Sequence, residues 1–167
     1  MSEEKQAVTM MDAPIYLGYN FKPCESASHF LSNLKQGKIV GMRRVNGDEV
    51  YVPPRGSCPK YGEPITVPVE LSDKGTVESF TIVHIPIPGN PIKPPFVVAN
   101  ILVDGAALSF IHLVSGVDNA DVRIGMRVQA EWKPEEEWDY SFENVKYFKP
   151  IDEPDVDVDA LREQHNA

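Results

Sequence analysis

Two short segments that each end in glycine constrain the fold of this chain more than any other feature. The segments are 43–47 and 58–62, and in each of them a pair of positions three residues apart is followed directly by Gly. Eleven residues, Gly47 to Ser57, separate the two pairs. Two thiolates at this spacing can grip one tetrahedral metal ion, and glycine allows the tight turn behind the second sulfur. The two segments therefore have the frame of a zinc ribbon.

The four positions that would hold the metal ion carry only one thiol. They are Arg43, Asn46, Cys58 and Tyr61. A guanidinium is cationic and cannot ligate, and one thiolate does not hold a structural zinc. We therefore expect a ribbon that has lost its metal, with no zinc cofactor and with Cys58 as a remnant. An ordinary hairpin with no history of metal binding is the alternative.

A double proline leads into the second segment. Residues 50–59 read Val-Tyr-Val-Pro-Pro-Arg-Gly-Ser-Cys-Pro, and residues 30–39 read Phe-Leu-x-x-Leu-Lys-x-Gly-Lys-Ile. Together they resemble the OB-fold, acyl-CoA-associated family with an N-terminal rubredoxin-like zinc ribbon (domain-of-unknown-function family thirty-five). The resemblance covers about residues 28–150. The chain departs from the family pattern in retaining only Cys58 of the four ribbon cysteines.

The resemblance implies a non-catalytic accessory subunit that binds a thiolase-like enzyme or a lipid-transfer-protein-like retro-aldolase. Such enzymes act on acyl-CoA thioesters, including those of steroid side-chain breakdown. In that setting the ribbon and barrel help to form the acyl-CoA site, acyl-CoA is a shared ligand, and the partner supplies the catalytic groups. We expect contacts to the partner or to CoA from Pro53, Pro54, Arg55, Pro88, Gly89, Pro94 and Pro95.

Arg55 is the strongest of these candidates because a guanidinium forms charge-assisted hydrogen bonds with a partner carboxylate or a CoA phosphate. An ordinary surface salt bridge is the other interpretation of Arg55. Five prolines stand between Pro86 and Pro95, and proline fixes the backbone and gives up its N–H donor. The loop is therefore stiff, which suits either a docking loop or a rigid connector.

The charge balance disfavours nucleic acid as a partner. The chain has 167 residues, 25 acidic and 16 basic, and a net charge of −9. Such a surface repels a phosphate backbone. The longest apolar runs fall far short of a membrane span, and two cysteines do not make a disulfide framework. We expect a cytoplasmic protein with neither a membrane nor a nucleic acid as partner.

The second half of the chain predicts a small β-barrel. The expected strands are residues 75–85, 96–103, 106–114, 127–132 and 142–151. Asp104-Gly105 is a hairpin signal between the second and third of them. Five strands with little helix between them fit a partly open OB barrel. A jelly-roll or immunoglobulin-like sandwich, which needs seven strands or more, is the second choice. The fold class is therefore mainly β, with an N-terminal helix and a degenerate ribbon hairpin before the barrel.

The first half predicts one helix and one hairpin. Residues 25–35 place Phe30, Leu31 and Leu34 on one helical face, with Ser26 or Ser28 as the cap and Gly37 at the end. Asn46-Gly47 predicts a hairpin turn that joins strands at 38–45 and 49–52.

These elements divide the chain into four parts. They are an N-terminal arm (1–24), the helix and metal-free ribbon (25–63), the OB barrel (64–151) and an acidic flexible tail (152–167). The arm carries Ile15, Tyr16, Leu17, Tyr19 and Phe21. It either lies extended on its own domain or docks on a partner chain, because large apolar groups are costly to leave in water. The tail is expected to be flexible, with a partner-bound segment as the alternative.

The sequence offers no constellation for catalysis. It has no nucleophile elbow, phosphate-binding glycine loop or filled metal cluster. His84, His112 and Glu78 are unlinked strand residues, so we expect no independent catalysis. The alternative function is a free-standing OB protein that binds acyl-CoA or a lipid, and single-stranded nucleic-acid binding ranks below it. A free-standing binder should bury the arm on itself, whereas a subunit can leave the arm exposed.

Overall fold

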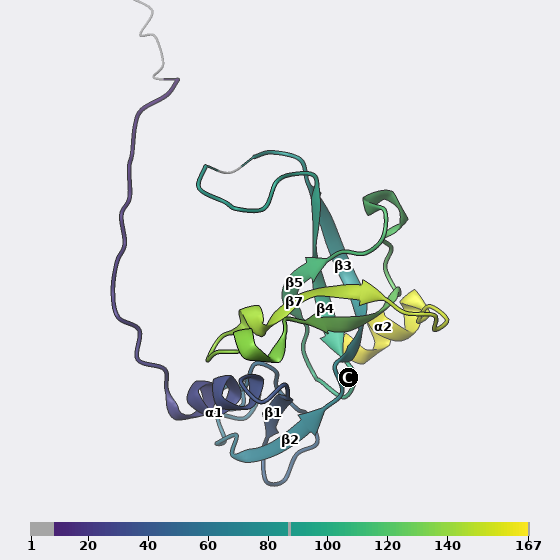
Figure 1. Cartoon of the computed structure of the whole chain (residues 1–167). Coiled ribbons are helices and arrows are strands. Elements are labelled where there is room, and N and C mark those ends of the chain that lie inside the picture. Colours follow the sequence, from purple (N-terminus) through teal and green to yellow (C-terminus); the bar gives the residue numbers. More distant parts are fainter. Residues whose placement is uncertain (1–8, 87, 167) are drawn as a thin grey trace, which may run out of the picture.

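A five-stranded β-barrel forms the centre of the molecule, with a small helix-and-sheet unit packed at one end (Figure 1). The structure is a computed structural model that describes residues 9–86 and 88–166. The elements, in chain order, are α1 (Glu25–Leu34), β1 (Ile39–Arg43), β2 (Val67–Leu71), β3 (Lys74–Val83), β4 (Phe96–Val103), β5 (Phe110–Val114), η1 (Asn119–Asp121), β6 (Arg127–Trp132), η2 (Glu135–Glu137), η3 (Phe142–Asn144), β7 (Val145–Pro150) and α2 (Val158–Asn166).

The barrel confirms the predicted fold class. Its strands follow the order β3-β4-β5-β7-β6 and close on themselves. All neighbours are antiparallel except β5 and β7, which run parallel where Val114 faces Phe148. Gly105 adopts φ 85°, and the Ala106 amide donates to Val103 at 2.9 Å, so the predicted turn between β4 and β5 is present. The barrel encloses a core of buried aliphatic residues around the fully buried Phe148.

The hairpin predicted around Asn46-Gly47 is only partly correct. β1 pairs over its whole length with β2, from Ile39 opposite Leu71 to Arg43 opposite Val67. The segment 49–52 makes only one bridge to β1, between Met42 and Tyr51, and a second bridge, from Val50, goes to Ala106. The two prolines at 53 and 54 follow at once and have no N–H to donate, so this segment cannot extend along β1. β1 therefore forms its longer strand pairing with β2.

Helix α1 begins and ends close to the predicted bounds, but its predicted cap is wrong. Cys24 occupies the N-cap position and makes no side-chain capping hydrogen bond. The helix begins at Glu25, so Ser26 and Ser28 both lie inside it and neither can cap it. The Ser28 hydroxyl donates to the Pro23 carbonyl at 3.5 Å. Gly37 does follow the helix with φ 71°, and a Cβ there would lie 2.5 Å from the Trp138 ring.

The core of the barrel continues into α1. Phe30 and Leu34 are buried in the same cluster as the barrel residues, and the Phe142 ring lies 5.7 Å from Phe30 and 4.9 Å from Phe110. The Asn144 side chain, also buried, donates to the carbonyls of Leu34 at 3.1 Å and Asp139 at 2.7 Å. It also accepts from the Asp139 amide at 3.0 Å. Asn144 thus joins the end of α1 to the loop between β6 and β7.

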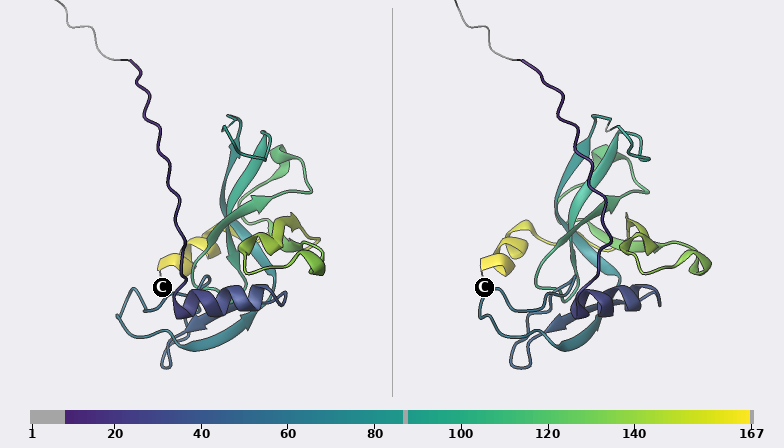
Figure 2. Two further views of the ribbon diagram at one scale, coloured as in Figure 1. Left: turned by 60° about the vertical axis from the view of Figure 1, so that its left-hand side comes forward. Right: turned by 90° about the vertical axis from the view of Figure 1, so that its left-hand side faces the viewer.

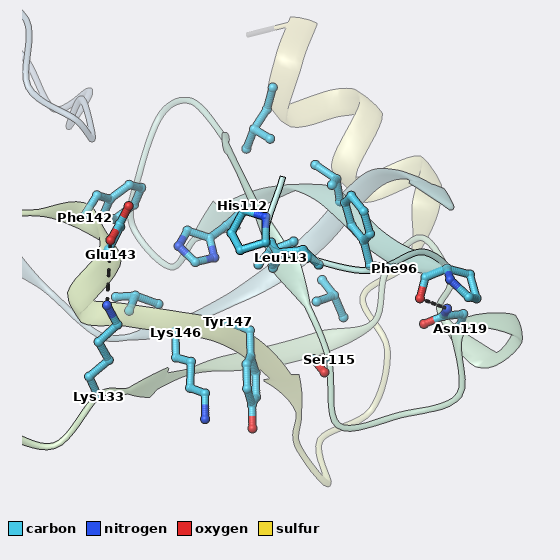
Figure 3. Close-up of a pocket in the computed structure, with 17 residues that line it drawn as sticks. Phe96, His112, Leu113, Ser115, Asn119, Lys133, Phe142, Glu143, Lys146 and Tyr147 are labelled. Atoms are coloured by element: carbon cyan, nitrogen blue, oxygen red, sulfur yellow. Dashed lines mark hydrogen bonds and ion pairs between the residues drawn. The ribbon is translucent and has the colours of Figure 1, made fainter. Parts of the chain in front are cut away.

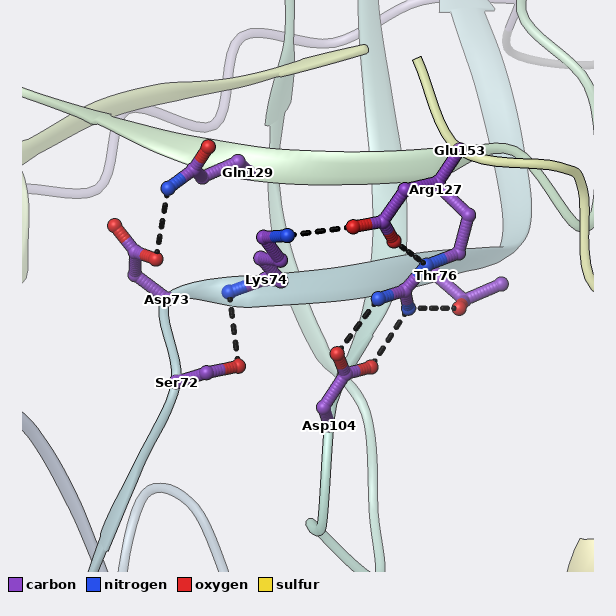
Figure 4. Close-up of polar contacts among 8 residues, drawn as sticks. All are labelled: Ser72, Asp73, Lys74, Thr76, Asp104, Arg127, Gln129 and Glu153. Carbon is purple, nitrogen blue, oxygen red and sulfur yellow. Dashed lines mark hydrogen bonds and ion pairs between the residues drawn. The ribbon is translucent and has the colours of Figure 1, made fainter. Parts of the chain in front are cut away.

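The predicted flexible tail differs from the structure, because the residues after β7 are fixed on the barrel. The Val156 amide donates to Gly125 at 2.9 Å, and Leu161 of α2 is buried. Carboxylates of the tail pair with cations of the barrel: Glu153 contacts both Lys74 and Arg127 (Figure 4). Hydrogen bonds from these two cations lower the pKa of Glu153. Glu153, together with Asp155, which pairs with Arg123, therefore anchors the tail on the barrel.

The N-terminal arm does not lie on its own domain. Residues 9–22 are exposed throughout and run beside the barrel without touching it (Figures 1 and 2). Seven large apolar side chains in this stretch face solvent: Met10, Met11, Ile15, Tyr16, Leu17, Tyr19 and Phe21. The expectation of an arm laid along the domain is therefore wrong for the residues that the structure describes.

We predict that Asn144→Ala lowers the free energy of unfolding by about 2 kcal/mol, because three hydrogen bonds of a buried side chain are lost together, one of them fully buried. Chemical denaturation measures the loss. The matched control is Asn100→Ala, which removes an exposed hydrogen bond to Ser79 and should change the value by less than about 0.5 kcal/mol. Equal losses in the two variants would contradict the role of Asn144.

Candidate functional site

An open groove of about 790 Å³ lies against strands β4, β5 and β7 (Figure 3). The proline-rich loop before β4 forms one side of the groove, and the η3–β7 segment forms another. The lining residues are Pro91, Ile92, Pro95, Phe96, Val98, Ile111, His112, Leu113, Val114, Ser115, Asn119, Lys133, Phe142, Glu143, Val145, Lys146 and Tyr147.

The groove exists because two barrel strands are apolar on both faces. On β4, Val97, Ala99 and Ile101 are buried, while Phe96 and Val98 alternate with them and are only half-buried. On β5, Phe110 and Val114 are buried in the core. Ile111 lies between them in the alternation, faces the groove and is 68% exposed. Successive side chains of a strand point to opposite faces, so one set fills the barrel and the other lines the groove.

Charged side chains occur at one region of this apolar surface. Lys133, Glu143 and Lys146 all line the groove, and the Lys133 ammonium lies 3.8 Å from the Glu143 carboxylate. Figure 3 shows Lys146 beside Tyr147, and Lys133 on the far side of Lys146, next to Glu143. Two cations and one anion leave a net positive charge here, on a chain whose overall charge is −9.

His112 stands in the groove wall with one nitrogen unsatisfied. Its ring packs edge-on against Phe142 at 5.2 Å and Phe148 at 5.5 Å. Its Nδ1 atom is buried and has no hydrogen-bond partner among the described residues. Burial lowers the pKa of His112, and backbone hydrogen bonds at Leu113 and Phe142 only partly oppose that effect. The imidazole is therefore neutral at pH 7.

The structure brings together only part of the predicted contact set. Pro95 lines the groove, while Pro88 and Gly89 are exposed elsewhere on the same loop and Pro94 is half-buried. Gly89 adopts φ 82°, which favours glycine at the tip of this loop.

The predicted contact segment at Pro53, Pro54 and Arg55 lies at the opposite end of the molecule from that loop (Figure 1). Pro54 is buried, whereas Pro53 and Arg55 are exposed. Arg55 forms no ion pair with any residue in the described ranges. Among these residues its guanidinium is thus available, and they provide no partner for the surface salt bridge that was the other interpretation of Arg55.

Two arginines hold together the segments that were predicted to form a degenerate ribbon. Nη1 of Arg43, at the first ligand position, donates to the carbonyls of Arg44 at 3.0 Å and Gly47 at 3.2 Å, which closes the turn. Arg44 pairs with Glu49 at 3.1 Å and Glu63 at 2.8 Å, and so joins the two segments. Hydrogen bonding to Arg44 lowers the pKa of Glu49.

The remaining ribbon positions are also accounted for without a metal. Tyr61 packs its ring 4.2 Å from the Arg44 guanidinium carbon. Cys58 is buried, with its sulfur 3.4 Å from the Tyr51 hydroxyl, so it is not an accessible reactive thiol. No group of three or more His, Cys, Asp or Glu side chains among the described residues could hold a metal ion.

The histidines do not assemble a catalytic pair. His112 of β5 pairs with Ala99 of β4, and Ala99 pairs with Phe80 of β3. His84 follows Phe80 by four residues, so β4 and four residues of chain separate the two histidines. His84 is also exposed, beyond the end of β3. Within 9–86 and 88–166, no helix is long and apolar enough to cross a membrane.

Sequence reasoning missed the groove residues of β5. Ile111, His112 and Leu113 interrupt the polar-apolar alternation expected of a half-solvated strand. This run of three residues could have predicted that β5 has a second apolar face. The sequence alone does not show that the proline-rich loop borders the same surface.

Comparison with known proteins identifies a matching family model and a relative. A family described as ChsH2, C-terminal OB-fold domain, matches residues 68–133. A DUF35 domain-containing scaffold protein of Methanocaldococcus jannaschii is 32% identical over 118 residues, which cover 68% of this chain and 82% of that protein.

Two solved structures share the fold. A structure described as Ltp2-ChsH2(DUF35) aldolase superposes with a TM-score of 0.60 at 22% identity, over 78% of this chain and 98% of the other. A DUF35 protein of unknown function from Sulfolobus solfataricus gives a TM-score of 0.58 at 22% identity, over 76% of this chain and 86% of the other.

We predict that the chain loses stability as the pH falls below 6.5, the ordinary pKa of histidine, and that His112→Phe reduces this loss. The unfolded chain protonates His112 in this range while the folded chain, with its lowered pKa, does not, so acid favours unfolding. Phenylalanine keeps the edge-on ring contacts and removes the unsatisfied nitrogen. Denaturation at several pH values measures the slope, and an unchanged slope in the variant would contradict the burial of a neutral imidazole.

Proposed function

The chain belongs to the DUF35 family, and from this premise we propose that it is a non-catalytic scaffold subunit that binds a thiolase-like catalytic subunit. The relative from M. jannaschii is described as a scaffold protein, and one structure with this fold is an aldolase that contains a DUF35 chain beside Ltp2. The proposal places the complex in the cytoplasm, with the catalytic groups on the partner.

The exposed N-terminal arm carries this proposal. Tyr16 is 95% exposed and Leu17 is 82% exposed, in a stretch that holds seven large apolar side chains. Burying one such side chain contributes about 1.5–3 kcal/mol, so an arm of this kind is costly in water and favourable in an interface. A free-standing binder would cover the arm with its own surface. Its exposure supports a subunit.

The proposal includes a contribution to an acyl-CoA site, in lipid metabolism and in steroid side-chain breakdown in particular. Two observations support it: the apolar groove along β4 and β5, and the available guanidinium of Arg55 at the ribbon end. A CoA phosphate or a partner carboxylate is the group that Arg55 would bind.

The second candidate function is a free-standing OB protein that binds acyl-CoA or a lipid. The groove is the observation that favours it, because a volume of about 790 Å³ suits a small ligand. The two functions are distinguished by whether the chain is isolated alone or in a complex with a catalytic partner.

We predict that the double variant Tyr16→Ser, Leu17→Ser weakens binding to the thiolase-like partner by at least about 100-fold, since each lost apolar contact costs about 1.5–3 kcal/mol and 1.4 kcal/mol is tenfold in affinity. Co-purification of co-expressed chains and titration of the purified subunits measure the change. The melting temperature of the isolated chain should not move, because both side chains are exposed.

The matched control for the arm is Ile124→Ser, which removes an exposed apolar side chain from the turn before β6. It should leave partner binding unchanged. Full affinity in the arm variant would show that the arm does not dock and would remove the observation on which the proposal stands.

A separate prediction concerns Arg55. Arg55→Ala should raise the KM for the acyl-CoA substrate of the assembled enzyme by about tenfold if the guanidinium binds a CoA phosphate, because a charge-assisted hydrogen bond contributes about 1.5–3 kcal/mol. If it binds a partner carboxylate, complex formation weakens instead by a similar factor. Steady-state kinetics and the subunit titration distinguish these outcomes, and no change in either measurement means that Arg55 has neither role.

A further inference from the structure

The outer half of β3 is an open strand edge. Near its start, Gly75 and Thr76 pair with β6 on one side and with β4 on the other. Beyond the bulge that follows Val77, residues 79–83 pair with β4 alone among the described residues. Figures 1 and 2 show this part of β3 and β4 projecting from the barrel as a two-stranded ribbon. The free side of the ribbon therefore presents backbone N–H and C=O groups that have no strand partner.

The sequence of this edge favours pairing with another strand. Residues 79–85 read Ser-Phe-Thr-Ile-Val-His-Ile, which is rich in the β-branched and aromatic residues that suit strands. Soluble proteins commonly protect an exposed edge with lysine, proline or a covering segment. Residues 79–85 contain no proline and no Lys, Arg, Asp or Glu, and Ile85 is 77% exposed. An uncharged edge with exposed apolar side chains indicates an interface.

The edge is complementary to itself in an antiparallel arrangement. When Thr81 lies opposite Thr81 of a second copy, Phe80 lies opposite Ile82 of that copy, and symmetry repeats this pair. Pairs of an aromatic with a β-branched residue, and of two threonines, stabilise antiparallel sheets. A register with Ile82 opposite Ile82 instead puts Phe80 opposite the polar His84. The pairing centred on Thr81 therefore matches the side chains better.

The ends of the edge fit the same register. Glu78 lies opposite His84 of the second copy, and an imidazole N–H can donate to a carboxylate. No two groups of like charge face each other between residues 78 and 84 in this arrangement. The complementarity favours a second copy of the chain as the partner, because a two-fold axis supplies each favourable pair twice.

We propose that two copies of this chain associate through antiparallel pairing of residues 79–83 of β3, with Thr81 on the two-fold axis. The two β3–β4 ribbons then form one continuous sheet. A pairing of this length makes an interface below the standard size of about 1,200–2,000 Å², so the dimer is weak and depends on concentration. The inference goes beyond the scaffold role and does not rest on it, because the edge is separate from the N-terminal arm.

The first test is sedimentation equilibrium of the full chain over a range of concentrations from about 1 to about 200 μM, which spans weak association. A salt concentration of about 0.3 M screens the repulsion between two chains that each carry a net charge of −9. We expect a change from monomer to dimer as the concentration rises.

Charge variants at the two-fold axis test the partner and the register together. Thr81→Lys and Thr81→Glu each put two like charges opposite each other, so each variant alone should dimerise at least about tenfold more weakly than the parent. An equimolar mixture of the two should dimerise again, because Lys then lies opposite Glu. Thr81 is exposed, so neither change should unfold the chain. Ile111→Lys, at an exposed position of β5, is the matched control and should dimerise like the parent.

A disulfide measures the register directly. In a Cys24→Ser background, Thr81→Cys should form a linked dimer on mild oxidation, because the Cα atoms of directly opposite residues lie about 4.5–5.5 Å apart. Ser79→Cys is the matched control. In this register the two copies of residue 79 are four residues out of step, roughly 13 Å apart, which exceeds the limit of about 7 Å for a disulfide. The native Cys58 is buried and should not link.

Three results would overturn the inference: a monomer at every concentration, an unchanged dimer in Thr81→Lys, or linkage of Ser79→Cys as readily as of Thr81→Cys. A monomeric parent whose Thr81→Lys variant loses the catalytic partner would assign the edge to that partner and not to a second copy. Failure here is distinguishable from failure of the proposed function. A chain that dimerises but captures no catalytic partner contradicts the scaffold role alone.

Discussion

The buried amide of Asn144 is the contact on which the arrangement of the two halves depends. It bonds to Leu34 at the end of α1 and to both backbone groups of Asp139 in the loop before β7. A side chain with one acceptor and two donors satisfies all three partners at once, inside a core where each unpaired group would be costly. Around it, the Phe142 ring contacts Phe30 and Phe110 and extends the barrel core into the helix. The helix, the ribbon and the groove therefore keep fixed positions relative to one another.

This rigid body exposes two different apolar features. One is the arm that precedes α1, which stands clear of the barrel. The other is the groove formed by the outer faces of β4 and β5. An exposed apolar segment gains most from a protein surface that covers it, while a groove suits a small ligand. The proposed scaffold would hold a catalytic partner with the arm and a small ligand in the groove, and neither use needs a catalytic residue on this chain.

Local sequence signals predicted the barrel well. Glycine turns and runs of apolar residues located α1, β3, β4 and β6 to within a few residues, because these elements are set by short-range patterns. Pairing between distant segments was not predictable in the same way. β1 pairs along its length with β2 and not with the segment 49–52, which is nearer in sequence. The tail contains a helix and is anchored to the barrel through Glu153. The four predicted ligand positions carry a single thiol, which is why the sequence predicts no metal there, but the link made by Arg44 to Glu49 and Glu63 depends on the folded geometry. The groove was missed since it joins residues from three strands and a loop.

Native mass spectrometry of the chain captured from its own cells with a mild tag tests the scaffold role most directly. The account predicts a complex with a thiolase-like chain in a fixed ratio. The mass of this subunit should equal that of the polypeptide, with no added zinc. Capture of the chain alone, under conditions that preserve other weak complexes from the same cells, would contradict the account.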